Sequence, residues 1–358
     1  MPTMIKRRTA GQPAGVNVTM LMYTNRKLIF NQPFYVGLVE NTIDAIQPDE
    51  IVVQNLYSLI SPGTELAFYS GTHTGLGDPS NTWAKYPFCP GYSTVGKILA
   101  KGGDVLNFRE GDTIYHTGKH EQYQVLNAAR SSMYPVPADL DPRAALFARF
   151  AQIAYTAIGK VEGNPQRVLV LGAGIIGNLA AQLFRTLKSA NVIVADSIDQ
   201  RLDLARQCGI SKTCNSSRRD FQDQLNQQTG GEPINCIIEA TGVPDLINFA
   251  LGHVGINGEV VLLGSPRGSI MLDAYKQIYS RGVRLTGAHE TTLSKTSHYG
   301  RTIDQPTVIR QMLELIRVGR LVVRPLIGTV LKPEDAKQGY EGLLRQKEAF
   351  HSVMIDWR

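Results

Sequence analysis

The feature that most limits what this chain can fold into is the segment VLVLGAGIIGNLAAQLF, which occupies residues 168–184. Apolar residues suited to a buried strand lead directly into the spacing G-x-G-x-x-G, formed by Gly172, Gly174 and Gly177. Gly172 would make the tight turn, Gly174 would let the backbone approach a pyrophosphate, and Gly177 would let helix and strand pack closely. The following helix would present N–H groups and a partial positive charge to that anion.

After these glycines, helical and strand-like patterns alternate. Apolar residues of IIGNLAAQLFRTLK recur at helical spacing and form one stripe, made of Ile176, Ala180, Leu183 and Leu187. Continuous apolar runs suit strands that are buried on both faces, and they read VLVL, VIVAD, INCIIEAT, EVVLLG and VRLTGAH. This alternation predicts an α/β domain with a parallel, doubly wound sheet, which we place at residues 158–305.

The next strand offers a second test of nucleotide binding. VIVAD ends in Asp196, about 20 residues beyond the glycines, where a carboxylate can accept hydrogen bonds from the adenosine ribose. A carboxylate there also repels a 2′-phosphate, so the sequence favours NAD over NADP. Arg201 tempers this preference, because a guanidinium can pair with a phosphate, stack on adenine or lie in solvent. The other interpretation of Asp196 is a helix N-cap or turn residue.

Shorter β-rich runs flank this central part. Runs such as VTMLMY, EIVVQNLYSLI, STVGKIL, DTIYHTG and EQYQVL, broken by Gly, Pro and Asn, predict a mostly antiparallel β domain over residues 17–157. Residues 306–358 carry two helical and two strand-like stretches, and we expect them to return to that domain. We expect residues 1–16 to be a loose, flexible extension, with a transit peptide as the alternative.

Composition narrows the class of protein. A chain of 358 residues can hold two domains, and its 43% hydrophobic and 19% charged residues argue against disorder. It has no run of about 18 apolar residues, so we expect no membrane span. The net charge is +6, but the basic residues are scattered, and we expect no nucleic-acid partner.

The cysteines do not form a recognisable pattern. No two of them come close to C-x-x-C spacing, and they are Cys89, Cys208, Cys214 and Cys236. Such spacing predicts neither a disulfide framework nor a four-thiolate zinc lobe. A reducing, cytoplasmic location is therefore the default expectation.

Along nearly its whole length the chain resembles the medium-chain dehydrogenase/reductase (alcohol dehydrogenase-like) superfamily. The matching stretches are SPGTEL, YPFCPGYSTVGKI, REGDTIY, AALFARFAQIAYTAI, LGAGIIG, QRLDLARQCG, IIEATG and GEVVLLG. The resemblance implies a GroES-like catalytic domain, a Rossmann NAD-binding domain, a cleft between them, and a homodimer or homotetramer. Besides the glycines, Asp196 and Arg201, the expected cofactor-binding residues are Ile175, Ile176, Ser197, Ala240, Thr241, Gly242, Gly264 and Ser265.

The chain departs from this superfamily at the zinc ligands. Zinc-dependent members supply a cysteine in a C-G-T-D-like segment and a histidine in a G-H-E segment, whereas residues 62–65 here read PGTE and residues 91–93 read GYS. The third ligand would fall near Ala148, where AALFARF offers none. Catalytic zinc needs about three protein ligands, so we expect no metal. The pair S-P-G-T-E and P-G-Y-x-x-V-G is similar to the zinc-less branch that contains the bacteriochlorophyllide-type dehydrogenases.

Without zinc, hydrogen-bond donors must stabilise the negative charge that develops on the substrate oxygen. By the resemblance, Tyr92 stands where a zinc-ligating histidine would be, and Thr64 where a proton-relay hydroxyl lies. Glu65 would orient this pair or contact Arg149, and His120 is the preferred proton carrier among the histidines. The plainer alternatives are a core aromatic residue for Tyr92, a turn residue for Thr64, a structural carboxylate for Glu65 and a surface-loop histidine for His120.

The leading prediction is a zinc-independent, NAD(H)-dependent oxidoreductase. It would transfer a hydride between nicotinamide and a small-molecule secondary alcohol or ketone, such as a polyol, a sugar or a natural-product intermediate. One alternative is an NADPH-dependent enoyl or quinone reductase, and another is a non-catalytic NAD-binding protein.

Overall fold

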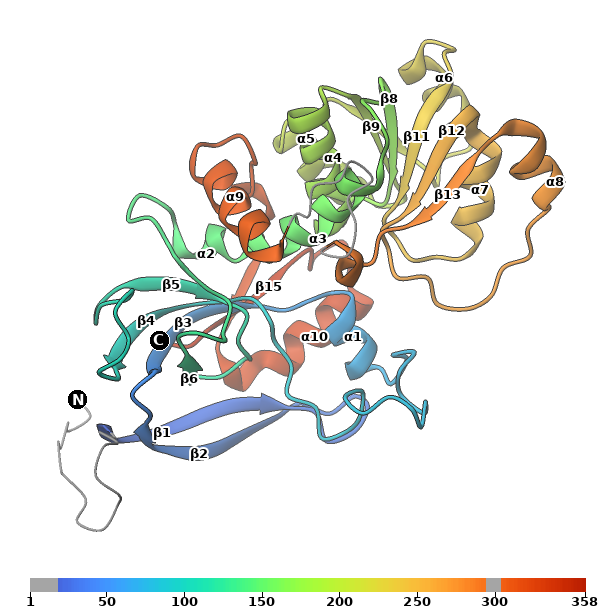
Figure 1. Cartoon of the computed structure of the whole chain (residues 1–358). Coiled ribbons are helices and arrows are strands. Elements are labelled where there is room, and N and C mark those ends of the chain that lie inside the picture. Colours follow the sequence, from blue (N-terminus) through green and yellow to red (C-terminus); the bar gives the residue numbers. More distant parts are fainter. Residues whose placement is uncertain (1–18, 294–303) are drawn as a thin grey trace. The chain divides into compact units, whose positions relative to one another are not determined.

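The computed structural model describes residues 19–293 and 304–358, so the expected extension at residues 1–16 lies outside the described chain (Figure 1). Clustering of contacts divides the chain into two compact units. The first contains the chain up to Phe147, Gly328–Gln346 and Ser352–Arg358, and the second contains Ala148–Ile327 and Lys347–His351. Within the described ranges, no helix is long and apolar enough to cross a membrane.

The second unit is built on a six-stranded parallel sheet in the order β10-β9-β8-β11-β12-β13. The strands are β8 (Arg167–Leu171), β9 (Asn191–Asp196), β10 (Lys212–Asn215), β11 (Ile234–Glu239), β12 (Val254–Leu262) and β13 (Arg284–Gly287). This is the order of a doubly wound Rossmann sheet, which confirms the predicted fold class. Of the strands in this sheet, the patterns missed β10, because KTCN contains no apolar run.

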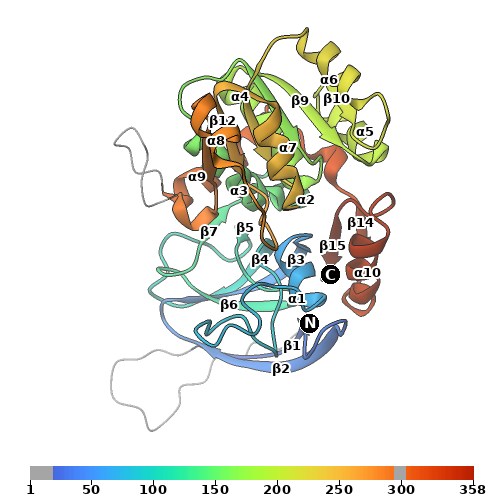
Figure 2. The same cartoon turned by 90° about the vertical axis from the view of Figure 1, so that its right-hand side faces the viewer.

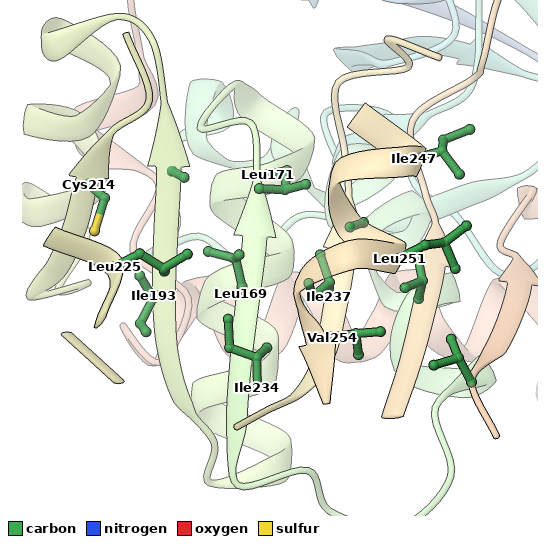
Figure 3. Packing of buried hydrophobic residues seen from close by; sticks show 14 residues of the cluster. Leu169, Leu171, Ile193, Cys214, Leu225, Ile234, Ile237, Ile247, Leu251 and Val254 are labelled. Atoms are coloured by element: carbon green, nitrogen blue, oxygen red, sulfur yellow. The ribbon is translucent and has the colours of Figure 1, made fainter. Parts of the chain in front are cut away.

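Helices cover this sheet on both faces. The helices of this unit are α3 (Phe147–Lys160), α4 (Ile175–Lys188), α5 (Asp199–Gln207), α6 (Phe221–Thr229), α7 (Asp245–His253), α8 (Ala274–Gln277) and α9 (Gln305–Arg317), and α4 to α7 contact the sheet. One face of the sheet packs on α6 and α7. A single buried cluster there joins Leu169 and Ile237 of the strands to Leu225 of α6 and Leu251 of α7 (Figure 3). Neither α4 nor α5 contributes to this cluster, although both pack against β9, and they cover the opposite face (Figure 1).

Helix α4 matches its predicted span but not its predicted single stripe. Ile176 and Leu187, at the two ends of the stripe, are only half-buried. Leu179 and Phe184, outside the stripe, are fully buried. The reason is that α4 is covered on its other side as well, where the side chain of Gln182 hydrogen-bonds the backbone N–H and C=O of Val322. A helix that is covered on both sides has no solvent-exposed polar face, so its apolar residues need not form a single stripe.

The first unit is β-rich. A seven-stranded sheet contains β14 (Thr329–Leu331), β15 (Val353–Asp356), β3 (Glu50–Leu59), β4 (Thr94–Lys101), β5 (Thr113–His116) and β7 (Met133–Pro135) in that order, with β6 (Tyr123–Asn127) paired to β3. All pairs are antiparallel except β14 with β15. A separate hairpin joins β1 (Thr19–Ile29) and β2 (Gly37–Ile46). The helices are α1 (Thr64–Tyr69), α2 (Pro142–Ala145) and α10 (Ala336–Arg345), and α10 packs beside β14 and β15 (Figure 2).

The limits of the units differ from the predicted domain limits. The sequence placed the first limit after residue 157, whereas the first unit ends at Phe147, where the continuous helix α3 begins. It placed the return at residue 306, whereas α9 and the chain up to Ile327 lie in the second unit. The bonds between Gln182 and Val322 explain the later return, because they hold this segment against α4.

Candidate active site

The glycine loop lies between the end of β8 and the start of α4. Gly172 has a φ of +97°, a conformation that favours glycine. A Cβ atom on Gly177 would lie 1.8 Å from the carbonyl oxygen of Gly172, so only glycine allows this approach of helix and strand. Gly174 is the N-cap of α4, and a Cβ there would meet no protein atom within 4 Å. The loop thus faces open space beside the first N–H groups of α4, which lack intrahelical partners, and this fits a bound pyrophosphate.

Asp196 is buried at the end of β9, with 8% of its surface exposed. Its Oδ2 accepts a hydrogen bond from the backbone N–H of Ala173 at 2.7 Å, and its Oδ1 accepts one from Ile198 at 2.9 Å. Asp196 therefore fixes the glycine loop, in part as the turn interpretation expected. A carboxylate has about four lone-pair sites, so further acceptor sites are left for ribose hydroxyl groups.

Some nitrogen atoms of the second unit are buried without a hydrogen-bond partner among the described residues. They include Nε of Arg201, whose Nη1 lies 3.7 Å from Asp196 Oδ2, and Nε2 of His351. Burial, together with the charge of Arg201, lowers the pKa of His351. Buried polar atoms are normally hydrogen-bonded, so these atoms fit a polar ligand at this edge of the sheet. His351 escaped the sequence analysis because it lies about 175 residues beyond the glycine loop and in no motif.

The ends of β11 and β12 lie beside the same loop. A Cβ atom on Gly172 would lie 2.7 Å from the Thr241 side chain, and one on Gly264 would lie 2.3 Å from the backbone nitrogen of Gly242. The structure therefore brings residues 240–242 and 264–265 together at the carboxyl edge of the sheet. The buried carboxylate of Glu239, which the sequence analysis missed, holds the first of these turns by accepting the N–H of Thr241 at 2.7 Å.

In the first unit, Tyr92 is joined to a residue that the sequence analysis did not single out. The Tyr92 hydroxyl donates a hydrogen bond to Ser61 Oγ at 2.5 Å. Ser61 is buried and Tyr92 is half-buried. The two residues lie in the PGTE and GYS neighbourhoods that supply a cysteine and a histidine in zinc-dependent relatives. We call Ser61 and Tyr92 the hydroxyl pair. Thr64, the other predicted hydroxyl, is half-buried at the first position of α1.

Glu65 lies at the centre of a buried hydrogen-bond network and is 1% exposed. Its Oε1 accepts the backbone N–H of Ser61 at 3.1 Å. Its Oε2 lies 2.9 Å from His120 Nε2 and accepts the hydroxyl of Tyr340 at 2.7 Å. Glu65 therefore fixes the backbone of Ser61, and no bond of its carboxylate to Tyr92 or Thr64 is seen among the described residues. Arg149, the other predicted partner of Glu65, forms a salt bridge with Glu290.

His120 is completely buried, so the surface-loop alternative is wrong. Its Nδ1 lies 2.7 Å from Ser58 Oγ, which also accepts the indole N–H of Trp357 at 2.9 Å. One arrangement of protons satisfies all of these atoms: Ser58 donates to Nδ1, and Nε2–H donates to Glu65. Both ring nitrogens of His120 then have partners within this buried network.

The described residues in the segments 62–65 and 91–93 do not fit the zinc ligands that the resemblance would place there. Pro62 and Tyr92 replace the cysteine and the histidine, and neither is an ordinary zinc ligand. Within the described ranges, no group of three or more His, Cys, Asp or Glu side chains could hold a metal ion.

Comparison with known proteins agrees with the fold. Residues 176–317 match the family model described as zinc-binding dehydrogenase, a range that leaves out residues 62–92. L-threonine 3-dehydrogenase of Vibrio cholerae is 24% identical over 303 residues, which cover 76% of this chain and 83% of that protein. These likenesses support an enzyme of the dehydrogenase type within the alcohol dehydrogenase-like superfamily.

Solved structures share the fold over nearly the whole chain. An alcohol dehydrogenase from Escherichia coli CFT073 in complex with NADH has a TM-score of 0.74 and 19% identity, and covers 93% of this chain and 99% of its own. A protein from Sinorhizobium meliloti 1021, described as a zinc-binding dehydrogenase and bound to NADP, has a TM-score of 0.75 and 18% identity. It also covers 93% of this chain and 99% of its own.

Proposed function

We propose that this protein is a zinc-independent, NAD(H)-dependent oxidoreductase of the alcohol dehydrogenase-like superfamily, and that it interconverts a secondary alcohol and the matching ketone. The substrate class we propose is a polyol, a sugar or a natural-product intermediate. The observation that carries the proposal is the hydroxyl pair, because it supplies two oxygen-bound protons in the segments where relatives supply zinc ligands.

The second unit would hold the cofactor. Gly172, Gly174 and the first turn of α4 would bind the pyrophosphate, and Asp196 would bind the adenosine ribose. Arg201 and His351 offer buried nitrogen donors nearby. Bound nicotinamide would supply or accept the hydride. We propose NAD because a buried carboxylate fixed by two backbone N–H groups would repel a 2′-phosphate.

The hydroxyl pair would handle the proton. When a hydride adds to a ketone carbon, the carbonyl oxygen becomes negative and takes the proton of the Tyr92 hydroxyl. The resulting tyrosinate accepts a hydrogen bond from Ser61 Oγ and regains a proton from water. In the oxidation of an alcohol, the same proton moves in the opposite direction. Hydroxyl donors therefore stabilise the charge that a Lewis acid stabilises in zinc enzymes.

The decisive experiment is Tyr92→Phe, which removes one hydroxyl and keeps the ring. We expect turnover to fall about 100-fold, the usual contribution of a general acid–base group. NADH affinity, measured by fluorescence titration, should stay within about twofold, since Tyr92 belongs to the other unit. Metal analysis of the purified protein should show no stoichiometric zinc. Unchanged turnover, or one zinc per chain, would contradict the proposal.

One observation favours a second candidate, an NADPH-dependent reductase of activated double bonds. The unpartnered Arg201 Nε beside Asp196 could serve a phosphate as well as a ribose. Assays of cofactor oxidation with NADH and NADPH separate the two functions. A non-catalytic NAD-binding protein would bind NADH and turn over nothing in a panel of ketones. We also propose a cytoplasmic location, since all four cysteines are free thiols.

A further inference from the structure

Two tyrosine–glutamate hydrogen bonds join α1 and α10 in opposite directions, and these helices lie side by side (Figure 1). Tyr340 of α10 donates to Glu65 of α1 at 2.7 Å, and Tyr69 of α1 donates to Glu341 of α10 at 2.5 Å. Glu65 and Tyr69 are one helical turn apart, and Tyr340 and Glu341 are consecutive. We call these four residues the tyrosine clamp.

The two halves of the tyrosine clamp have different surroundings. Glu341 is 30% exposed and also pairs with Arg345 at 3.0 Å, so water and a cation can replace the hydroxyl of Tyr69. Glu65 is buried, and no water can replace the hydroxyl of Tyr340, which is itself completely buried. A buried carboxylate that loses a donor is left under-satisfied, at a cost that an exposed one avoids.

We propose that Tyr340 is a positioning residue for the hydroxyl pair, acting through the Glu65 carboxylate. Tyr340 fixes Oε2, the rigid carboxylate fixes Oε1, and Oε1 holds the backbone N–H of Ser61. The backbone of Ser61 in turn sets the position of its Oγ, 2.5 Å from the Tyr92 hydroxyl. This inference rests on the function proposed above, because it assigns a role to Tyr340 only if the hydroxyl pair carries the proton.

The surroundings of Tyr340 keep it a hydrogen-bond donor. Burial, followed by the charge of Glu65 and their hydrogen bond, raises its pKa well above the ordinary value of a tyrosine. Tyr340 therefore stays protonated at neutral and at moderately alkaline pH. By contrast, Tyr92 would have to release its proton during the reaction, so the two tyrosines have different duties.

The test compares Tyr340→Phe with Tyr69→Phe in the full-length enzyme. Each change removes one hydroxyl of the tyrosine clamp, so the second variant is a matched control. We expect Tyr340→Phe to lower kcat about 10-fold, since a small misplacement of a reacting group is costly, with the KM for NADH unchanged. Tyr69→Phe should leave kcat within about twofold. Equal losses in the two variants would reduce Tyr340 to a structural contact.

A double-mutant cycle with Tyr92→Phe separates this inference from the proposed function. If Tyr340 acts through the hydroxyl pair, adding Tyr340→Phe to Tyr92→Phe should lower kcat no further, because the pair is already lost. Multiplying effects would overturn the inference. Unchanged turnover in Tyr92→Phe alone would overturn the proposed function instead. Should Tyr340→Phe fail to fold, Glu65→Gln, which keeps an acceptor for Ser61, takes its place in the same cycle.

Discussion

At the scale of single residues, two buried acids, Asp196 and Glu65, each make more than one contact. Asp196 closes the glycine loop through the N–H of Ala173 and would also bind ribose. Glu65 holds Ser61 and receives two further hydrogen bonds. The sequence identifies these acids from their position in a motif, but it does not show what each one contacts. Substitutions at these positions must therefore be interpreted with both tasks in mind.

Asp196→Ala should weaken NAD binding about 10-fold or more, since a hydrogen bond to a charged group contributes about 1.5–3 kcal/mol. NADP binding should fall less, because removal of the carboxylate also removes its repulsion of the 2′-phosphate. Calorimetric titration with both nucleotides measures the difference. Equal losses for NAD and NADP would mean that Asp196 acts only through the loop, by its bond to Ala173.

At the scale of elements, the strand–loop–helix unit of β8 and α4 was predicted closely because its constraints are local. Gly172 and Gly177 are required by backbone geometry within six residues of chain. The strands β3 to β6 were predicted for a similar reason, since each is a short β-rich run that is separated from the next by turn residues. By contrast, β10 lacks an apolar run, and the return to the first unit depends on Gln182 and Val322.

Two glycines of the loop offer a matched pair of substitutions. Gly177→Ala forces a Cβ against the backbone oxygen of Gly172, so we expect it to lower stability by about 1–3 kcal/mol, as overpacking does. Gly174→Ala places its Cβ in open space and should leave the melting temperature nearly unchanged while weakening NADH binding about 10-fold or more, which corresponds to about 1.4 kcal/mol. Thermal melting and NADH titration distinguish the two. Equal stability of both variants would contradict the packing argument.

At the scale of the whole molecule, the chain builds part of the first unit, then most of the second, and then returns to the first, except that Lys347–His351 rejoins the second unit. Strand β13 lies at one end of the six-stranded sheet, and none of the described strands pairs with its outer edge. Natural proteins seldom leave such an edge open. We therefore propose that the protein is a homodimer or homotetramer, as the superfamily resemblance implies.

Light scattering coupled to size-exclusion chromatography measures this directly. We expect a mass of two or four times the 39.3 kDa of one chain. The same measurement on Leu285→Pro tests whether the edge of β13 forms the contact. Proline lacks the N–H that a partner strand would need, so a larger fraction of this variant should have the mass of one chain. A wild-type mass of one chain would refute the assembly proposal without affecting the proposed chemistry.

The sequence by itself determined the doubly wound parallel domain, its glycine loop between the first strand and helix, and the acid at the end of its second strand. These features depend on residues close together in the chain, where strand and helix periodicity and glycine geometry act locally. Only the tertiary structure decided that Ser61 meets Tyr92, that His120 and Tyr340 are buried against Glu65, and that Nε2 of His351 is buried without a partner among the described residues. Tyr340 is separated from Glu65 by 275 residues, and a hydrogen bond across such a distance leaves no periodic signal in the sequence.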